Sequence, residues 1–124
     1  MKHRNWRRIT LRLIVGFAIL WLVWFAPVPF VKSWWLSANP DTGGLLNVRL
    51  RMADWLVLTH RLNGRSHAQV VELLGEPPPH DKFRGQGVAY VLGPERGFVS
   101  IDYEWLLLTL GKAGTVENAA VVTD

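Results

Sequence analysis

The longest apolar run of the chain lies near its amino terminus, directly after a cluster of basic residues. Residues 13–25 read LIVGFAILWLVWF and follow Lys2, Arg4, Arg7, Arg8 and Arg12. A bilayer core of about 30 Å needs about 20 helical residues. The run reaches that length if residues 9–12 join it, or if the helix continues past its prolines to residue 31. This pattern predicts an uncleaved transmembrane signal anchor over 13–31.

Aromatic and basic residues flank the apolar run on both sides, as they do at membrane interfaces. The predicted anchor residues are Trp6, Arg7, Arg8, Arg12, Leu13, Phe17, Leu20, Trp21, Trp24, Phe25, Trp34 and Trp35. A cleaved signal peptide is the first alternative, with residues 37–39 as a late cleavage site, because Pro27 directly after Ala26 disfavours cleavage there. The second is a buried core helix of a soluble protein.

The distribution of charge predicts the orientation. The formal net charge is +4, yet residues 1–12 carry five basic groups and no acid, whereas the rest carries nine basic and ten acidic groups. The positive-inside rule then makes residues 1–12 a cytoplasmic head and places residues 32–124 across the membrane. A near-neutral remainder gives no indication of nucleic-acid binding. The chain has no cysteine, which excludes disulfides and thiol chemistry.

Residues 32–44 are rich in turn formers and predict a linker, and a domain follows over 45–124. Apolar residues at helical spacing predict a first helix: Leu45, Val48, Met52, Trp55, Leu56 and Leu62. The segment 63–77 predicts a second, short helix. In it Gly64 makes a turn, Ser66 and Gln69 form a capping box, Val70, Leu73 and Leu74 form the buried face, Gly75 gives a left-handed stop and Pro77 prevents continuation.

The remainder of the chain is rich in β-branched and aromatic residues. Residues 88–92, 99–102 and 105–110 have strand character, and residues 111–114 predict a hairpin turn into residues 115–122. We expect three antiparallel strands. The predicted fold class is therefore α+β: one transmembrane helix, then two helices packed on a three-stranded antiparallel sheet.

Several of these residues carry a resemblance to a known family. The run G-x-S-x-x-x-V-x-x-L-L-G-x-P from Gly64 to Pro77, then Tyr90 to Gly93, then a hairpin with Gly111 and Gly114, resembles small envelope domains of the BamE (SmpA/OmlA) type. Those domains share the fold of β-lactamase-inhibitor-protein repeats. The resemblance implies a non-enzymatic accessory role in the bacterial cell envelope. Because the lipidated cysteine of that family is absent, it also implies an inner-membrane protein with a periplasmic domain.

Residues suited to catalysis or metal binding are scarce. His60, His67 and His80 have no metal-ligand spacing, Ser66 lies outside any nucleophile elbow, and residues 85–87 precede a strand rather than open a helix. Asp102 and Glu104 are the nearest approach to an acidic cluster. The sequence therefore predicts no catalytic residue, no metal and no cofactor.

The function predicted from these observations is that of a membrane-anchored interaction module, whose α+β domain meets an envelope protein or lipid. Its expected partners are the bilayer and an envelope protein. Two alternatives stay open. One is a tethered hydrolase or small-ligand binder that uses Asp102, Glu104 and a histidine, and the other is a small subunit that acts mainly through its transmembrane helix.

Overall fold

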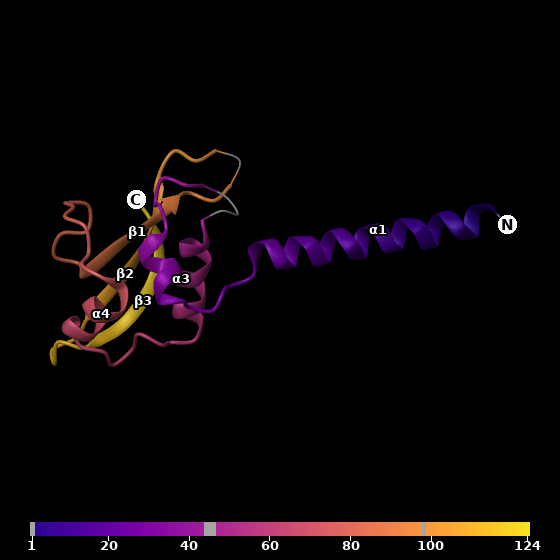
Figure 1. Cartoon of the computed structure of the whole chain (residues 1–124). Coiled ribbons are helices and arrows are strands. Elements are labelled where there is room, and N and C mark those ends of the chain that lie inside the picture. Colours follow the sequence, from indigo (N-terminus) through magenta and orange to yellow (C-terminus); the bar gives the residue numbers. More distant parts are fainter. Residues whose placement is uncertain (1, 44–46, 98) are drawn as a thin grey trace.

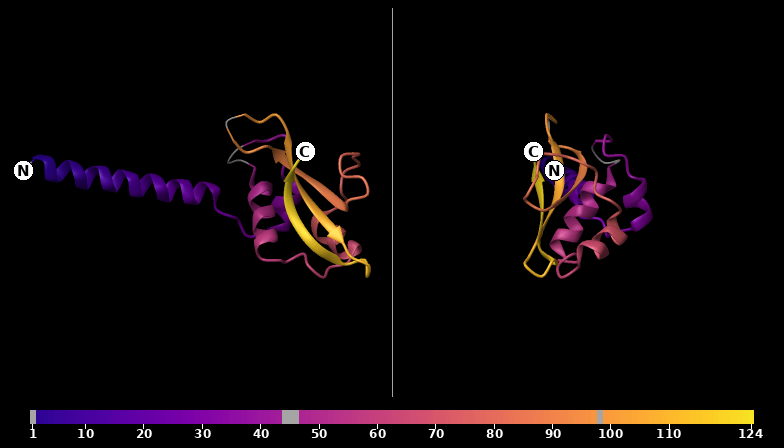
Figure 2. Two further views of the ribbon diagram at one scale, coloured as in Figure 1. Left: turned by 180° about the vertical axis from the view of Figure 1, so that it is seen from behind. Right: turned by 90° about the vertical axis from the view of Figure 1, so that its left-hand side faces the viewer.

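The computed structural model describes residues 2–43, 47–97 and 99–124, without the side chains of residues 2–4 and 24. The described chain forms four helices and a three-stranded antiparallel sheet of order β1-β2-β3. Their bounds are α1 (Lys2–Phe25), α2 (Lys32–Ser37), α3 (Val48–Leu58), α4 (His67–Leu74), β1 (Val88–Pro94), β2 (Tyr103–Leu110) and β3 (Val116–Thr123). Figure 1 shows α1 extending away from a domain formed by the other elements, and Figure 2 shows α2, α3 and α4 on one face of the sheet.

The predicted transmembrane anchor is wrong. In the described part of the chain, no helix has both the length and the apolar character needed to cross a membrane. The apolar run 13–25 covers only about 20 Å at 1.5 Å per residue. Toward the amino terminus α1 continues into Arg7, Arg8 and Arg12, and at the other end it stops at Phe25. A single-pass inner-membrane location with a periplasmic domain therefore loses its support.

The segment predicted as a linker contains a helix that belongs to the core. Trp34 and Trp35 were expected to flank a membrane, but they lie in α2, where Trp34 is 53% exposed and Trp35 is fully buried. The chain between α1 and α2 is also tied to the domain, because the backbone N–H of Val28 donates to the carbonyl of Arg51 at 3.1 Å. The expectation of two helices on the sheet failed because α2 is a third.

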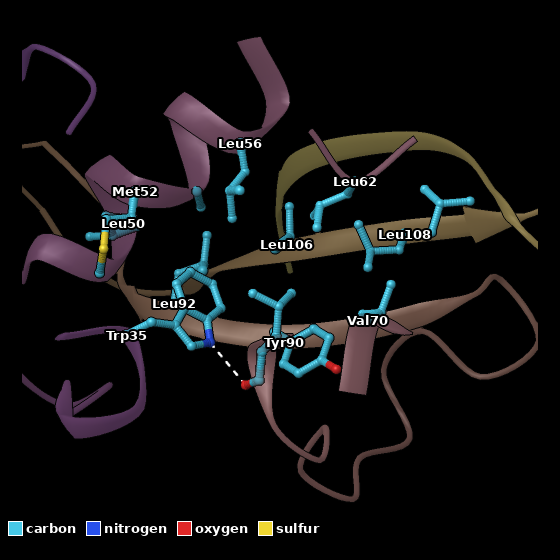
Figure 3. Packing of buried hydrophobic residues seen from close by; sticks show 13 residues of the cluster. Trp35, Leu50, Met52, Leu56, Leu62, Val70, Tyr90, Leu92, Leu106 and Leu108 are labelled. Atoms are coloured by element: carbon cyan, nitrogen blue, oxygen red, sulfur yellow. Dashed lines mark hydrogen bonds between the residues drawn. The ribbon is translucent and has the colours of Figure 1, made fainter. Parts of the chain in front are cut away.

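Trp35 joins α2 to the rest of the domain (Figure 3). Its indole Nε1–H donates to the carbonyl of Leu74 at 3.0 Å, and its ring lies edge-on to Tyr90 with centroids 6.3 Å apart. The Arg49 guanidinium lies 4.7 Å from the ring centroid and donates to the Trp35 carbonyl. Burial lowers the pKa of Arg49. One side chain thus contacts α3, α4 and β1.

Helices α3 and α4 begin at residues whose side chains cap them. The Asn47 side chain accepts from Leu50 N–H at 3.3 Å, whereas Leu45 lies outside the described residues. The predicted capping box of α4 is present: Ser66 Oγ accepts from Gln69 N–H, and Gln69 Oε1 accepts from Ser66 N–H. Gly75 ends this helix with φ 84° and ψ 178°, a glycine conformation other than the predicted left-handed one.

Tyr90 links β1 to the end of α4. Its hydroxyl donates to the Gly75 carbonyl at 2.8 Å. Burial and the nearby carboxylate of Glu76 raise the pKa of Tyr90 to about 12. The phenol therefore stays protonated and keeps this hydrogen bond over the ordinary pH range. Val70 and Leu74 of α4 are buried against the same core, and Leu73 is half-buried.

The three strands agree with the expected meander except at one segment. Residues 99–102, which were given strand character, lie outside the sheet, and β2 begins at Tyr103. A bulge interrupts the β1–β2 pairing between Val91 and Gly93. At Gly93 a side chain would collide with the Asn47 amide, which donates to the Leu92 carbonyl at 2.8 Å. At Gly114, φ 75° suits the hairpin turn into β3.

Replacing Trp35 tests how far the domain depends on it. Trp35→Ala is expected to lower the free energy of unfolding by about 3–5 kcal/mol, because it removes the largest buried side chain. Trp35→Phe keeps a ring but leaves the Leu74 carbonyl without its donor, at about 1–3 kcal/mol. Urea unfolding of the full chain measures both.

The matched control for this prediction is Trp34→Ala, because Trp34 is the exposed neighbour on the same helix. Its effect should stay within about 0.5 kcal/mol, as for most surface substitutions. Equal losses for Trp34→Ala and Trp35→Ala would contradict the central role of Trp35.

Candidate interaction site

The surface of α1 is the most unusual feature of the molecule. The large apolar side chains described between Trp6 and Phe25 are 44–72% exposed. A helix with apolar residues on every side is normally buried. Such a surface, free in the described chain, is the signature of a binding surface. The predicted anchor residues Leu13, Phe17, Leu20, Trp21 and Phe25 all belong to it, while the side chain of Trp24 lies outside the described part.

The first half of α1 has two distinct faces. Arg7, Arg8 and Arg12 follow one another at spacings of one and four residues, which places them within one arc of the helix. The opposite arc carries an apolar stripe of Trp6, Ile9 and Leu13, which continues into the second half of the helix at Phe17 and Leu20, while exposed Leu11 lies among the arginines. All members of this stripe are more than half exposed, and the three arginines are exposed as well. This part of α1 is a basic amphipathic helix.

Arg51 of α3 holds the last turn of α1. Its Nε–H donates to the carbonyl of Ala26 at 2.9 Å, and its Nη2 donates to the carbonyl of Val23. These carbonyls lie at the helix end, where backbone acceptors have no partner within the helix and where positive charge is favourable. The sequence does not indicate this role of Arg51, because its partners lie 25 and 28 positions away.

The sheet face turned away from the helices carries a second, smaller apolar cluster. Phe83, Ala89 and Trp105 are buried there, and half-buried residues surround them: Val91, Tyr103, Leu107 and Val122. Phe83 comes from the segment between α4 and β1, and its ring centroid lies 5.5 Å from that of Trp105. His80 packs on the same indole at 5.0 Å. The segment 80–83 thus covers part of the second face of the sheet.

Asp102 and Glu104 do not form a shared acidic site. Asp102 is exposed and precedes β2, whereas Glu104 is 8% exposed and faces Arg96. Both Glu104 oxygens accept from the Arg96 guanidinium, at 2.9 Å for the shortest pairs, and Oε2 also accepts from Arg96 N–H. The pair that the sequence suggested for chemistry is thus divided, and its buried member stabilises the connection between β1 and β2.

Arg96 and Asp54 complete this ionic cluster. The Arg96 guanidinium also donates to Asp54 of α3, at 2.5 and 3.2 Å. Burial lowers the pKa of Arg96, but hydrogen bonds and charges from Asp54 and Glu104 outweigh it and raise that pKa overall. The guanidinium is therefore permanently charged and joins α3 to the sheet. From sequence alone this cluster was not evident, because its members lie 8 and 42 positions apart.

Asp124 closes the far edge of the second apolar cluster. Its carboxylate accepts from Tyr103 N–H at 2.9 Å and from Trp105 Nε1–H at 3.0 Å, and it pairs with Lys82. Its side chain is 4% exposed. Burial raises the pKa of Asp124, but the hydrogen bonds from Lys82, Tyr103 and Trp105 outweigh burial and lower it. Sequence reasoning assigned no role to this residue.

The three histidines after α1 lie in different segments of the chain. His60 is exposed after α3 with φ 54°, His67 is the exposed first residue of α4, and His80 packs beside Trp105 with its Nδ1 lacking a hydrogen-bond partner among the described residues. Over residues 2–43, 47–97 and 99–124, no three His, Cys, Asp or Glu side chains gather in a way that could hold a metal ion. Ser66 and Gly64 belong to the cap and turn before α4.

Comparison with known proteins gives no match: no family model, no curated protein and no solved structure is similar to this chain. The resemblance to BamE-type domains therefore stays a prediction. The structural features that bear on function are the exposed α1, the apolar sheet face and the two ionic clusters.

The lowered pKa of Asp124 predicts how stability depends on pH. A carboxyl whose folded pKa lies below its unfolded value of about 3.9 stabilises the fold above that value, and this contribution is lost as the pH falls through the folded pKa. Asp124→Asn should therefore lower the free energy of unfolding near neutral pH and flatten its fall in acid. Urea unfolding between about pH 7 and pH 3 measures both effects.

Asp81→Asn is the control, because Asp81 is 91% exposed and meets Arg84 only at 3.9 Å. This variant should follow the wild-type pH profile. A profile of Asp124→Asn that runs parallel to the wild type at every pH would contradict the assignment.

Proposed function

We propose that the protein is a non-enzymatic interaction module that binds, through α1, to the surface of a lipid bilayer with anionic headgroups. The observation that carries the proposal is the combination of exposed apolar residues with a basic face on one helix. Basic amphipathic helices lie along membrane interfaces, with their apolar stripe among the acyl chains and their basic side chains at the headgroups. Apolar segments of 10–14 residues, such as residues 13–25, occur in interfacial helices as well as in buried core helices and signal peptides.

A lipid surface suits α1 better than a protein groove does. A groove covers one stripe of a helix, whereas the second half of α1 is apolar on all sides and exposed on all of them. Acyl chains at an interface adapt to the side chains of a helix and need no complementary shape. Arg7, Arg8 and Arg12 then contribute attraction to anionic lipid, at about 1 kcal/mol for each residue near the surface.

The α+β domain is then the part that the bound chain presents to other molecules. The resemblance to BamE-type domains supports a binding role of this kind. The pairing of both Glu104 oxygens with Arg96 speaks against the alternative of a hydrolase, since that carboxylate is already fully engaged. A domain held by Arg51 at the end of α1 would keep a defined position near the lipid surface.

Vesicle binding tests the contribution of charge. The full chain should co-float with vesicles of phosphatidylcholine and phosphatidylglycerol and bind more weakly to phosphatidylcholine alone. Arg7→Gln with Arg8→Gln should weaken binding to the mixed vesicles by about 30-fold, the equivalent of about 2 kcal/mol. Arg84→Gln with Lys112→Gln removes two exposed charges from the domain and is the matched control, with binding unchanged.

The apolar stripe gives a second, independent arm of the same test. Leu13→Ser with Phe17→Ser should weaken binding to both kinds of vesicle by more than about 100-fold, because each side chain contributes about 1.5–3 kcal/mol on burial. Val99→Ser with Ile101→Ser removes two apolar residues that are 67% and 79% exposed elsewhere, and it should bind like the wild type. Equal binding by all four double variants, or no vesicle binding by the wild type, would overturn the proposal and favour a protein partner.

A further inference from the structure

One edge of the sheet is formed by β3, whose pairing with β2 fixes which backbone groups point outward. The N–H of Asp124 donates to the Tyr103 carbonyl at 3.1 Å, and Trp105 lies opposite Val122. In an antiparallel pair, hydrogen-bonded positions alternate along the strand. Residues 120, 122 and 124 therefore bond toward β2, and the N–H and C=O groups of Ala119, Val121 and Thr123 point away from the sheet.

The outward groups are used at only one end of β3 in the described chain. The Val116 carbonyl accepts from Gly64 N–H at 2.9 Å, and Val116 N–H donates to the Arg65 carbonyl at 2.8 Å. Over the described residues, no backbone or side-chain hydrogen bond outside the sheet reaches residues 119, 121 or 123. About three residues of strand edge thus offer donors and acceptors in alternation.

This edge lacks the features that normally prevent strand association. Charged residues, lysine above all, and proline commonly protect natural edges. From Asn118 to Thr123, β3 has no charge and no proline, and its bulge lies at the other end, opposite Thr109 and Leu110. Residues 119–122 are small or β-branched, which favours a strand, and they are half-buried.

We propose that β3 pairs with β3 of a second copy of this chain, antiparallel, to form one continuous six-stranded sheet. A two-fold axis requires each outward residue to face another outward residue. All three outward positions are paired when Val121 faces Val121 of the second copy and Ala119 faces Thr123. The three hydrogen-bonded positions then exchange about six backbone hydrogen bonds.

The charges of β3 agree with this register. Asn118 lies opposite Asp124 of the second copy, and within the paired residues 119–123 there is no charge at all. In this register each copy offers the other the same three outward positions. An unrelated extended peptide would need a suitable sequence of its own. The pairing is independent of α1 and goes beyond lipid binding by the helix.

Cysteine substitution tests the register directly, because the natural chain has no cysteine. Positions 119 and 123 of opposite copies would have Cα atoms about 5.5 Å apart, within the Cα range of disulfides, although the Cβ atoms of a hydrogen-bonded pair must approach by about 1 Å for the bond to form. Two copies of the same position would be separated by four residues of strand, about 13 Å. Ala119→Cys alone and Thr123→Cys alone are therefore expected to stay uncrosslinked under mild oxidation.

The double variant Ala119→Cys with Thr123→Cys, as full chain in mild nonionic detergent, should be crosslinked to a dimer to a much greater extent than either single variant. An equal mixture of the two single variants should link about half of the chains, the share expected from random pairing. Strong links in each single variant, or none in the double variant while both thiols react with maleimide, would overturn the proposal. The latter outcome would leave the edge to a different extended segment. Because the readout depends on position within β3, it fails or succeeds independently of vesicle binding.

Discussion

The burial of Trp35 is the constraint on which the rest of the structure depends. Its indole can be buried only if a polar partner receives the Nε1–H, and the free carbonyl of Leu74 at the end of α4 supplies it. The Tyr90 hydroxyl donates to the next carbonyl, that of Gly75. Residues of α2, α4 and the sheet therefore meet around Trp35 and Tyr90 (Figure 3). Helix α1 ends at Phe25, where Pro27 and Pro29 stop the helix, and the chain can then return to the domain and place Trp35 inside it.

The sheet and α4 were predictable because their signals are local. The capping box depends on two residues three positions apart. The strands are short segments rich in β-branched and aromatic residues, which is a local signal as well. β2 carries apolar residues on both faces, which already indicates that both faces are covered. The sequence could not show that segment 80–83 provides part of the second cover, since Phe83 and Trp105 are far apart along the chain.

The predicted anchor failed on a local property, the short length of the apolar run. The predicted linker failed because of a contact over a long sequence distance: residues 32–37 lack clean periodicity, and their helix is stabilised by the burial of Trp35. Residues 99–102 have strand propensity but lie in the connection between β1 and β2, where Arg96 pairs with Glu104 and Asp54. Of the candidate site, the apolar and basic residues of α1 were visible in the sequence. Its defined end at Arg51 was not.

Helix α1 and the outer edge of β3 favour different kinds of partner, because α1 exposes apolar side chains and the β3 edge exposes backbone hydrogen-bonding groups. The backbone groups of α1 bond within the helix, and its apolar side chains are exposed. In the proposed lipid-bound state, any apolar medium with anionic groups nearby would cover these side chains. The β3 edge presents backbone donors and acceptors in a fixed order, and only another strand in a defined register satisfies them. The proposed lipid binding would therefore depend on the composition of α1, whereas the proposed edge pairing would depend on the register of two strands. A chain confined to a surface by α1 would meet its own copies at higher local concentration, which makes weak edge pairing effective.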